Sequence, residues 1–203
     1  MLIFKDKLPK TNRAAIVAKI GKVSRNLGID PNWLMAVINF ETAGTFSTTI
    51  QNPYTGATGL IQFNEDFRGA GYKTVGGTRY PITEIRGMDH LQQLELIERY
   101  YAPYRNKIKG FVDLYLATFF PLAMGKPDDW VLRTDRVSAR AIAEANPVFD
   151  QGGQVTVGSI KKGLLTKVPA QYLGYLIKNS SKGITLVVLV ALGIVIYNMV
   201  KSN

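Results

Sequence analysis

One glutamate, Glu41, stands at the end of an apolar stretch and precedes a loop rich in Gly, Thr and Asn; residues 39–63 read NFETAGTFSTTIQNPYTGATGLIQF. In a helix, Val37 and Ile38 lie four and three residues before Glu41, so the glutamate continues the apolar face. Apolar surroundings and the C-terminal end of a helix dipole both raise the pKa of a carboxyl group. A raised pKa suits a general acid that works near neutral pH. The alternative is a partly exposed helix-end glutamate with no chemical role.

Other kinds of chemistry are limited by the composition. The chain has no cysteine and a single histidine, His90. Disulfides, thiol catalysis and thiolate metal sites are therefore excluded, and a histidine metal cluster or a Ser-His-Asp triad is disfavoured. The length of 203 residues, with 46% hydrophobic and 20% charged residues, is typical of one globular domain plus an appendage.

Four segments have the pattern of helices, and they would position Glu41. Apolar residues recur at helical spacing in residues 12–27, which Gly28 follows as a stop signal. Asp30-Pro31 is a cap followed by a first-turn proline, and it opens the helix that ends at Glu41. Residues 89–101 and 111–120 are the other two helices, each followed closely by a proline. These patterns predict a mainly α fold.

Between the second and third of these helices lies a long stretch, residues 44–88, with few periodic runs. So long an irregular segment in a compact domain is usually functional. We expect a substrate-binding loop or a small hairpin there.

The pairing of Glu41-Thr42 with GATGLIQF at residues 56–63 resembles the lysozyme-like superfamily, in its soluble lytic transglycosylase and goose-type lysozyme branch. Members of that branch have a helix that ends in Glu-Ser or a near variant, then a loop with Gly-Ala-x-Gly-Leu-x-Gln. The resemblance covers about residues 28–150 and extends to QQL (92–94), YYAPY (100–104) and DLYLATFFPLAMGKP (113–127), where it is closest to phage-encoded members.

The resemblance implies a lysozyme-like helical domain in which Glu41 is the catalytic acid/base and Gln62 belongs to the glycan-binding cleft. The other candidate substrate-binding residues are Gly59, Leu60, Phe63, Tyr54, Tyr115 and Phe119. Many members have Ala-Tyr-Asn where this chain has Thr118-Phe119-Phe120, so Tyr115 or Tyr54 would have to replace the missing tyrosine. Tyr115 and Phe119 also fit a second interpretation, as core aromatics.

The mechanism implied by the resemblance needs neither a metal nor an organic cofactor. Residues 146–157 look like a worn calcium loop, but they offer only Asp150 as a carboxylate, so we interpret them as a turn without metal. Glycoside hydrolysis usually requires two carboxylates. Glu65, Asp66, Glu84 and Asp89 are merely near in sequence, and this favours a single-acid lytic transglycosylase. The alternatives are a non-catalytic virion structural protein with a decayed lysozyme fold, and a chitinase-like hydrolase.

The C-terminal part differs from the rest in composition. After Asp150 there is no acidic residue, whereas there are six lysines. Eighteen uncharged residues, GITLVVLVALGIVIYNMV, lie between Lys182 and Lys201. As a helix they would span roughly 27 Å, close to the hydrocarbon thickness of a bilayer. We expect a lysozyme-like domain over 1–150, a basic juxtamembrane segment over 151–182 and a transmembrane helix over 183–200; the alternative is a buried core helix or strand.

The expected partners are peptidoglycan glycan strands, a lipid membrane and other virion proteins. No nucleic-acid motif is present, so no nucleic-acid partner is expected. The N-terminal MLIFKDKLPK lacks the apolar run of a secretory signal, and the lysines before the span mark a cytoplasmic flank. Both features would keep a cellular enzyme away from the wall. We therefore expect a virion membrane or virion entry apparatus as the location, and the host cell membrane as the alternative.

Overall fold

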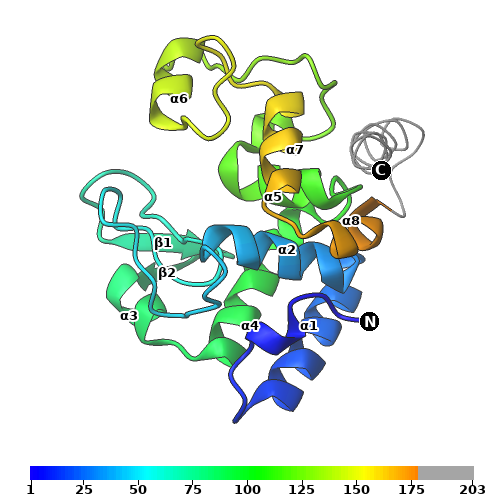
Figure 1. Ribbon diagram of the computed structural model, residues 1–203. Helices are drawn as coiled ribbons and strands as arrows, with labels where there is room; N and C mark the ends of the chain where they lie inside the picture. The colour runs from blue at the N-terminus through cyan, green and yellow to red at the C-terminus, as the bar shows by residue number, and fades with distance from the viewer. Residues whose placement is uncertain (178–203) are drawn as a thin grey trace, which may run out of the picture.

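The computed structural model describes residues 1–177, and this part of the chain is mainly helical (Figure 1). Its α-helices are α1 (Arg13–Leu27), α2 (Pro31–Glu41), α3 (Ile82–Gly87), α4 (His90–Tyr101), α5 (Phe111–Phe119), α6 (Ala139–Ala145), α7 (Val157–Thr166) and α8 (Ala170–Ile177). Its 3-10 helices are η1 (Lys5–Lys7), η2 (Ala102–Tyr104) and η3 (Pro121–Ala123). Its strands are β1 (Tyr72–Val75) and β2 (Thr78–Pro81).

Helix α2 is the centre of the hydrophobic core. Every residue from Asn32 to Ile38 is buried, so the helix is covered on all sides before it ends at Glu41. It contacts α1, α5 and α8. A helix that is apolar all round belongs in the interior, and here the helices around α2 keep water from it. Glu41 is thus the last residue of a buried helix, whose position the surrounding core determines.

The residues that were expected to end α1 and to begin α2 do so in the structure. Gly28 adopts a left-handed conformation with φ 69° and ends α1. The Asp30 side chain accepts a hydrogen bond from Asn32 N at 2.8 Å, and Pro31 occupies the first turn of α2. The helices predicted at 12–27, from Asp30-Pro31 to a point before Gly44, at 89–101 and at 111–120 are confirmed as α1, α2, α4 and α5.

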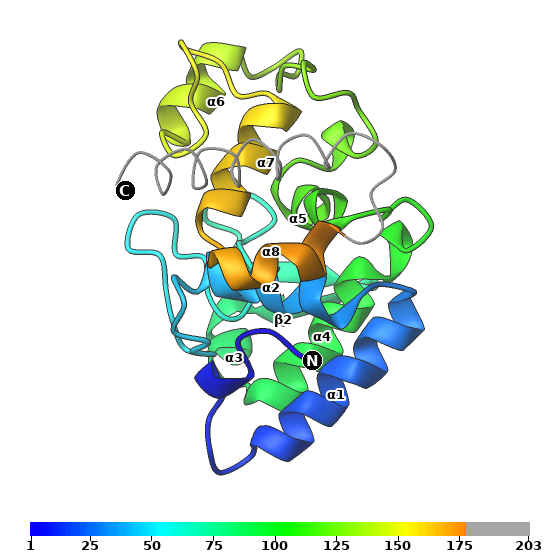
Figure 2. The ribbon, with the colours of Figure 1, turned by 45° about the vertical axis from the view of Figure 1, so that its right-hand side comes forward.

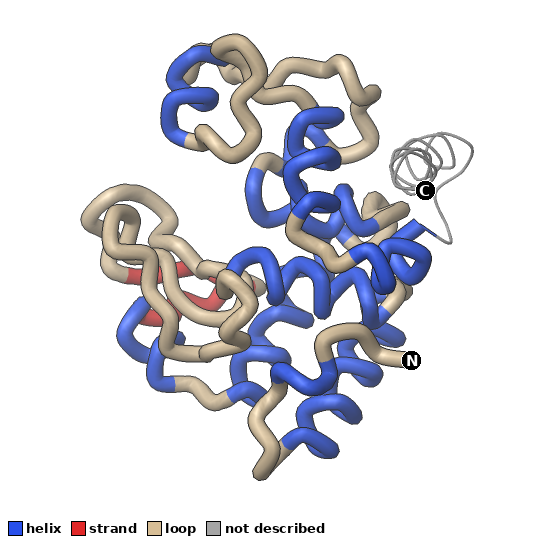
Figure 3. The backbone as a smooth tube through the Cα atoms, viewed as in Figure 1, coloured by secondary structure: helices blue, strands red, loops and turns tan. Residues whose placement is uncertain are grey.

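Loops concentrate on two sides of the molecule, around the hairpin and around α6 (Figure 3). The segment 44–88 contains the antiparallel pair β1–β2, whose register pairs Tyr72 with Pro81 and Val75 with Thr78. The two residues of its turn, Gly76 and Gly77, have φ values of 57° and 83°. Two-residue hairpin turns require positive φ, which glycine adopts without strain. The expected small hairpin is therefore present.

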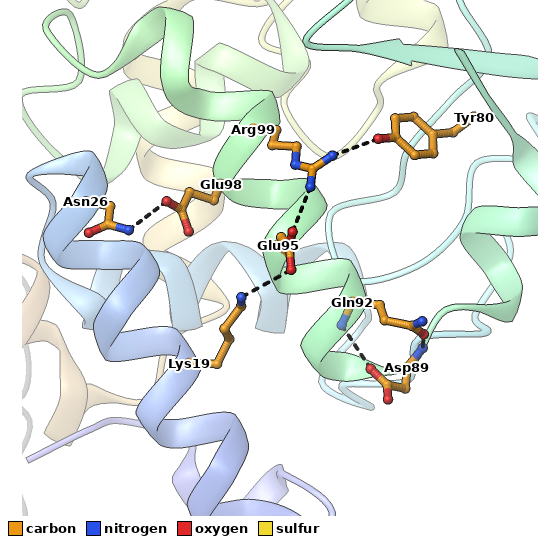
Figure 4. A network of polar contacts seen from close by, with 8 residues as sticks. All are labelled: Lys19, Asn26, Tyr80, Asp89, Gln92, Glu95, Glu98 and Arg99. Carbon is orange, nitrogen blue, oxygen red and sulfur yellow. Dashed lines mark hydrogen bonds and ion pairs between the residues drawn. The ribbon is translucent and has the colours of Figure 1, made fainter. Parts of the chain in front are cut away.

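A polar network fastens α4 to its neighbours (Figure 4). Glu95 lies 3.5 Å from the Lys19 ammonium of α1 and accepts a 2.7 Å hydrogen bond from Arg99, one turn later on α4. Arg99 also donates to the Tyr80 hydroxyl of β2 at 3.0 Å. Glu95 and Arg99 are exposed, so each pair adds little to stability. Their geometry nonetheless sets α4 between α1 and the hairpin.

Helices α7 and α8 lie in the range 151–182 that was predicted as a basic juxtamembrane segment. Ile160 and Leu164 of α7 and Leu176 of α8 belong to the same hydrophobic core as α2. Figure 2 shows α8 lying across α2. From α8, Tyr172 meets the ring of Phe4 edge-on, with 5.0 Å between the ring centroids.

Among residues 1–177, no helix is long and apolar enough to cross a membrane. The predicted transmembrane helix, residues 183–200, lies outside the described residues.

Candidate active site at the end of helix α2

Glu41 is a half-buried carboxylic acid with no hydrogen-bond partner in the described part of the chain. Ser24 Oγ is the sole buried side-chain oxygen or nitrogen there that lacks a partner, so the Glu41 oxygens still reach solvent. Burial raises the pKa of Glu41 to about 8. The carboxyl is enclosed enough to prefer its neutral form and open enough to meet a ligand. The direction of this pKa shift is the one expected from the apolar face of the helix.

Three tyrosines from two other helices lie close enough to Glu41 for its charge to affect them. Burial raises the pKa of Tyr100 and Tyr101 of α4 and of Tyr115 of α5, and the charge of Glu41 contributes to each rise. Tyr101 is fully buried, and its hydroxyl shares a 2.7 Å hydrogen bond with Thr118 Oγ1. The hydroxyls of Tyr100 and Tyr115 have no partner within residues 1–177. These two hydroxyls therefore differ from that of Tyr101, since no hydrogen bond within the described residues uses them.

Three aromatic rings pack against Tyr115 and hold its ring in place. Its ring meets Phe40 edge-on at 5.2 Å, stacks on Phe119 at 5.4 Å and contacts Phe149 at 5.8 Å. Phe119 also contacts Phe149 at 5.6 Å and is half-buried. Phe119 is thus a packing partner of Tyr115. Tyr115, one turn before it on α5, is the tyrosine whose hydroxyl remains available.

A cavity of about 500 Å³ adjoins the same end of α2. Its walls are formed by Asn39, Phe40, Ala43, Gly44, Val148 and Lys167. Glu41 is not in that wall, so the cavity is a neighbouring space beside the last turn of the helix.

The Gly-Leu-Ile-Gln segment forms a tight turn closed by Thr58 and Phe63, which exchange backbone hydrogen bonds at 2.9 and 2.8 Å. Gly59 has φ 79° and Gln62 has φ 51°, both left-handed. Gln62 Nε2 donates to Gly59 O at 3.1 Å, so this side chain braces its own turn. A Cβ on Gly59 would lie 2.5 Å from the Gln93 side chain. Glycine is needed there both for its conformation and for this close approach.

The other predicted substrate-binding residues differ in burial: two lie in the core and one lies on the surface. Leu60 and Phe63 are each 2% exposed and belong to the core. Phe63 meets the ring of Tyr100 edge-on at 5.8 Å, which ties the turn to the tyrosines around Glu41. Tyr54 is 94% exposed, and no interaction within residues 1–177 joins it to Glu41. Phe63 thus contacts a tyrosine near Glu41, whereas Tyr54 is a surface residue.

Gln93 is a buried residue whose role sequence reasoning missed. From α4, its Oε1 accepts a hydrogen bond from Leu60 N at 2.9 Å, and its Nε2 donates to Thr48 O and Ile85 O, both at 2.8 Å. One side chain thereby joins the Gly-Leu-Ile-Gln turn, the start of the loop and α3. A sequence signal for this role exists: Gln93 lies four residues before Ile97, on the apolar face of the helix, where a polar side chain must find buried partners.

Replacing Gln93 with alanine should destabilise the fold by about 3 kcal/mol, because it leaves buried backbone groups without partners. The measurement is urea unfolding of Gln93→Ala beside Gln151→Ala. Gln151 is exposed, and its side chain forms no hydrogen bond in the described residues, so its loss should matter by less than about 0.5 kcal/mol. Equal unfolding midpoints for the two variants would contradict this role of Gln93.

Glu84 is exposed on α3 and has no partner in residues 1–177, whereas the other three acids near Glu41 in sequence have structural partners. Glu65 accepts hydrogen bonds from the N–H groups of two glycines at 2.7 and 2.9 Å, which lower its pKa. Burial alone would raise the pKa of Asp66, but hydrogen bonds from Thr74 and Lys73 lower it overall. Asp89 caps α4 in a capping box. Each of these three carboxylates is held in its charged form or in a cap, unlike Glu41.

Asp150 also serves a turn: its Oδ1 accepts a hydrogen bond from Gly153 N at 2.8 Å. Gly152 and Gly153 both have positive φ, as a tight turn requires. Within residues 1–177, no group of three or more His, Asp or Glu side chains is placed to hold a metal ion.

Comparison with known proteins gives no further assignment, because no protein-family model matches this chain and no curated protein matches it.

Proposed function

We propose that this protein is a membrane-anchored lytic transglycosylase that cleaves the glycosidic bond between N-acetylmuramic acid and N-acetylglucosamine in peptidoglycan. The observation that carries the proposal is Glu41, a partnerless carboxyl whose pKa is raised to about 8 at the end of a buried helix. Perturbed acids that lack a structural partner are candidates for catalysis. The resemblance of GATGLIQF and the flanking helices to the transglycosylase branch supplies the reaction and the substrate class.

In the proposed reaction, the protonated Glu41 donates its proton to the glycosidic oxygen, and the bond from that oxygen to C1 of the muramyl residue breaks. The acetamide of the substrate stabilises the positive charge that develops at C1. Glu41, now a carboxylate, takes the proton of the muramyl C6 hydroxyl, whose oxygen forms the new bond to C1. The product is a 1,6-anhydro ring, no water is consumed, and Glu41 returns to its protonated form.

A raised pKa serves both halves of this cycle. At pH 7 a carboxyl with a pKa of about 8 is mostly protonated and ready to donate. Once ionised in an enclosed setting, it is a stronger base than an ordinary glutamate, since the same burial favours recovery of the proton. Glu65, Asp66 and Asp89 are occupied by hydrogen bonds, a salt bridge or a helix cap, which supports a single-acid mechanism over a hydrolase with two carboxylates.

We expect the fragments released from purified peptidoglycan to carry 1,6-anhydromuramic ends, because Glu65 and Asp66, the acids that follow the Gly-Leu-Ile-Gln turn, are held by hydrogen bonds and are not free to activate water. Mass spectrometry of the fragments is the measurement, and purified chitin serves as the second substrate. Muramic acid at reducing ends would indicate a hydrolase. Cleavage of chitin alone would support the chitinase-like alternative, and binding without cleavage would support the non-catalytic virion protein.

We also propose that residues 183–200 anchor the domain in the membrane of a phage particle or in its entry apparatus. The support is the uncharged eighteen-residue stretch with lysines at both ends and the phage-like character of residues 113–127. The full-length protein should partition with detergent from purified particles, whereas a chain ending at Asn179 should stay soluble without it. Absence from particles, or equal solubility of the two forms, would contradict this location.

A further inference from the structure

Two consecutive tyrosines of α4 differ in the state of their hydroxyl groups. Tyr101 is fully buried, and its hydroxyl is joined to Thr118 Oγ1 at 2.7 Å. Tyr100 is half-buried, and its hydroxyl has no hydrogen-bond partner in residues 1–177. Because that oxygen is not among the buried atoms without a partner, it reaches solvent. Tyr100 therefore keeps an accessible donor that no contact of the fold uses.

The ring that carries this hydroxyl is firmly held. Phe63 lies edge-on to it at 5.8 Å, Tyr101 edge-on at 5.4 Å and Tyr104 tilted at 6.5 Å. The Lys73 ammonium lies over its face at 5.8 Å from the centroid. Fixing the ring in advance lowers the entropy cost of any hydrogen bond that the hydroxyl makes to a ligand.

The surroundings keep the proton on this hydroxyl and place it near the acid of the site. Burial raises the pKa of Tyr100 to about 12, and the charges of Tyr104, Glu41 and Asp66 add to the rise. The hydroxyl therefore remains protonated, and able to donate, at neutral pH. The charge of Glu41 affects Tyr100, so the two groups lie near each other.

We propose that Tyr100 is a substrate-binding residue whose hydroxyl donates a hydrogen bond to an oxygen of the N-acetylated sugar held beside Glu41. Saccharides present many oxygen acceptors, and a preformed donor on an aromatic ring suits them. The inference rests on the proposed function and names a contact that neither the motif nor its spacing identifies. Phe63, from the Gly-Leu-Ile-Gln turn, acts through Tyr100 by holding its ring, so it is a positioning residue.

The chain offers a matched pair of variants for the test. Tyr100→Phe removes a hydroxyl without a protein partner, so the unfolding midpoint should not change. Tyr101→Phe removes a buried hydroxyl that is bonded to Thr118, so its unfolding midpoint should fall by about 2–4 °C. A purely structural role for both tyrosines would give no difference in ligand binding between them.

The experiment uses full-length protein in detergent with Glu41→Gln as the background, which prevents cleavage during titration with tri-N-acetylchitotriose. Calorimetry should show an affinity about 3- to 10-fold weaker with Tyr100→Phe, the range expected for one neutral hydrogen bond, and unchanged with Tyr101→Phe. With Glu41 intact, kcat/KM on peptidoglycan should fall by the same factor with Tyr100→Phe.

Unchanged affinity and turnover with Tyr100→Phe would overturn the inference, as would an equal loss with Tyr101→Phe. If the parent protein binds the sugar but cleaves no peptidoglycan, a weaker Tyr100→Phe complex still supports the inference while the proposed function fails. If the parent protein neither binds the sugar nor cleaves peptidoglycan, the inference about Tyr100 and the proposed function are both wrong.

Discussion

Glu41→Gln should reduce peptidoglycan cleavage by about 100- to 10,000-fold while the domain stays folded. Glutamine has nearly the shape of the protonated acid that Glu41 is at pH 7, but it can neither donate the proton nor recover it. The carboxyl forms no hydrogen bond or ion pair in the described residues, so the substitution breaks no structural contact. The measurement is turnover of purified peptidoglycan, with circular dichroism to confirm folding.

Glu84→Gln is the control for this experiment. Glu84 is exposed on α3 and, within residues 1–177, has neither a hydrogen bond nor an ion pair. Its loss removes one carboxylate of the same kind and should leave activity unchanged. Undiminished lysis by Glu41→Gln would mean that another carboxylate is the acid, and Glu65 and Asp66 would be the next to replace.

The stability of the wild-type protein should fall relative to Glu41→Gln as the pH rises from about 4.5 to about 8. The pKa of Glu41 is about 8 in the folded protein and 4.5 as an ordinary carboxyl. Between these values the folded state binds more protons than the unfolded state, so the free energy of unfolding decreases with pH. The contribution of protonated Glu41 is fully present below pH 4.5 and lost by pH 8. At about 1.4 kcal/mol per pKa unit, the loss amounts to a few kcal/mol.

Urea unfolding of both proteins at a series of pH values from 4.5 to 8.5 measures this difference. Other groups with shifted pKa values, such as Glu65 and Asp66, are common to both proteins and cancel in the comparison. A difference that stays constant across this range would mean that Glu41 ionises as freely as an exposed glutamate. The enclosed setting assigned to it would then be wrong.

The helices that carry the candidate site are encoded locally. A cap with a first-turn proline at Asp30-Pro31 and the left-handed Gly28 are short-range signals, and both act as such in α1 and α2. The apolar face of residues 33–41 likewise predicts the enclosed position of Glu41 and the direction of its pKa shift. These features depend on residues within a turn or two of each other, so periodicity and capping are enough to find them.

Helices α3, α6, α7 and α8 were not predicted from the sequence, because their formation depends on tertiary contacts. Helices α3 and α6 are short, with six and seven residues, and short helices depend on packing more than on propensity. α7 and α8 lie in a stretch that was distinguished chiefly by its lysines. Their apolar residues matter because of what they meet: Tyr172 of α8 packs on Phe4, which lies at the opposite end of the described chain.

The sequence by itself determined the mainly helical class, the hairpin region and one acid at the end of an apolar helix. Only the tertiary structure decided which groups join that acid. Gln93 binds Leu60 across 33 residues of chain, and Phe63 of the turn contacts Tyr100 of α4. Likewise, the hydroxyl of Tyr101 is bonded to Thr118 while that of its neighbour Tyr100 is free. Two adjacent tyrosines look alike in sequence, and they differ because helix packing brings one hydroxyl to a partner and leaves the other without one.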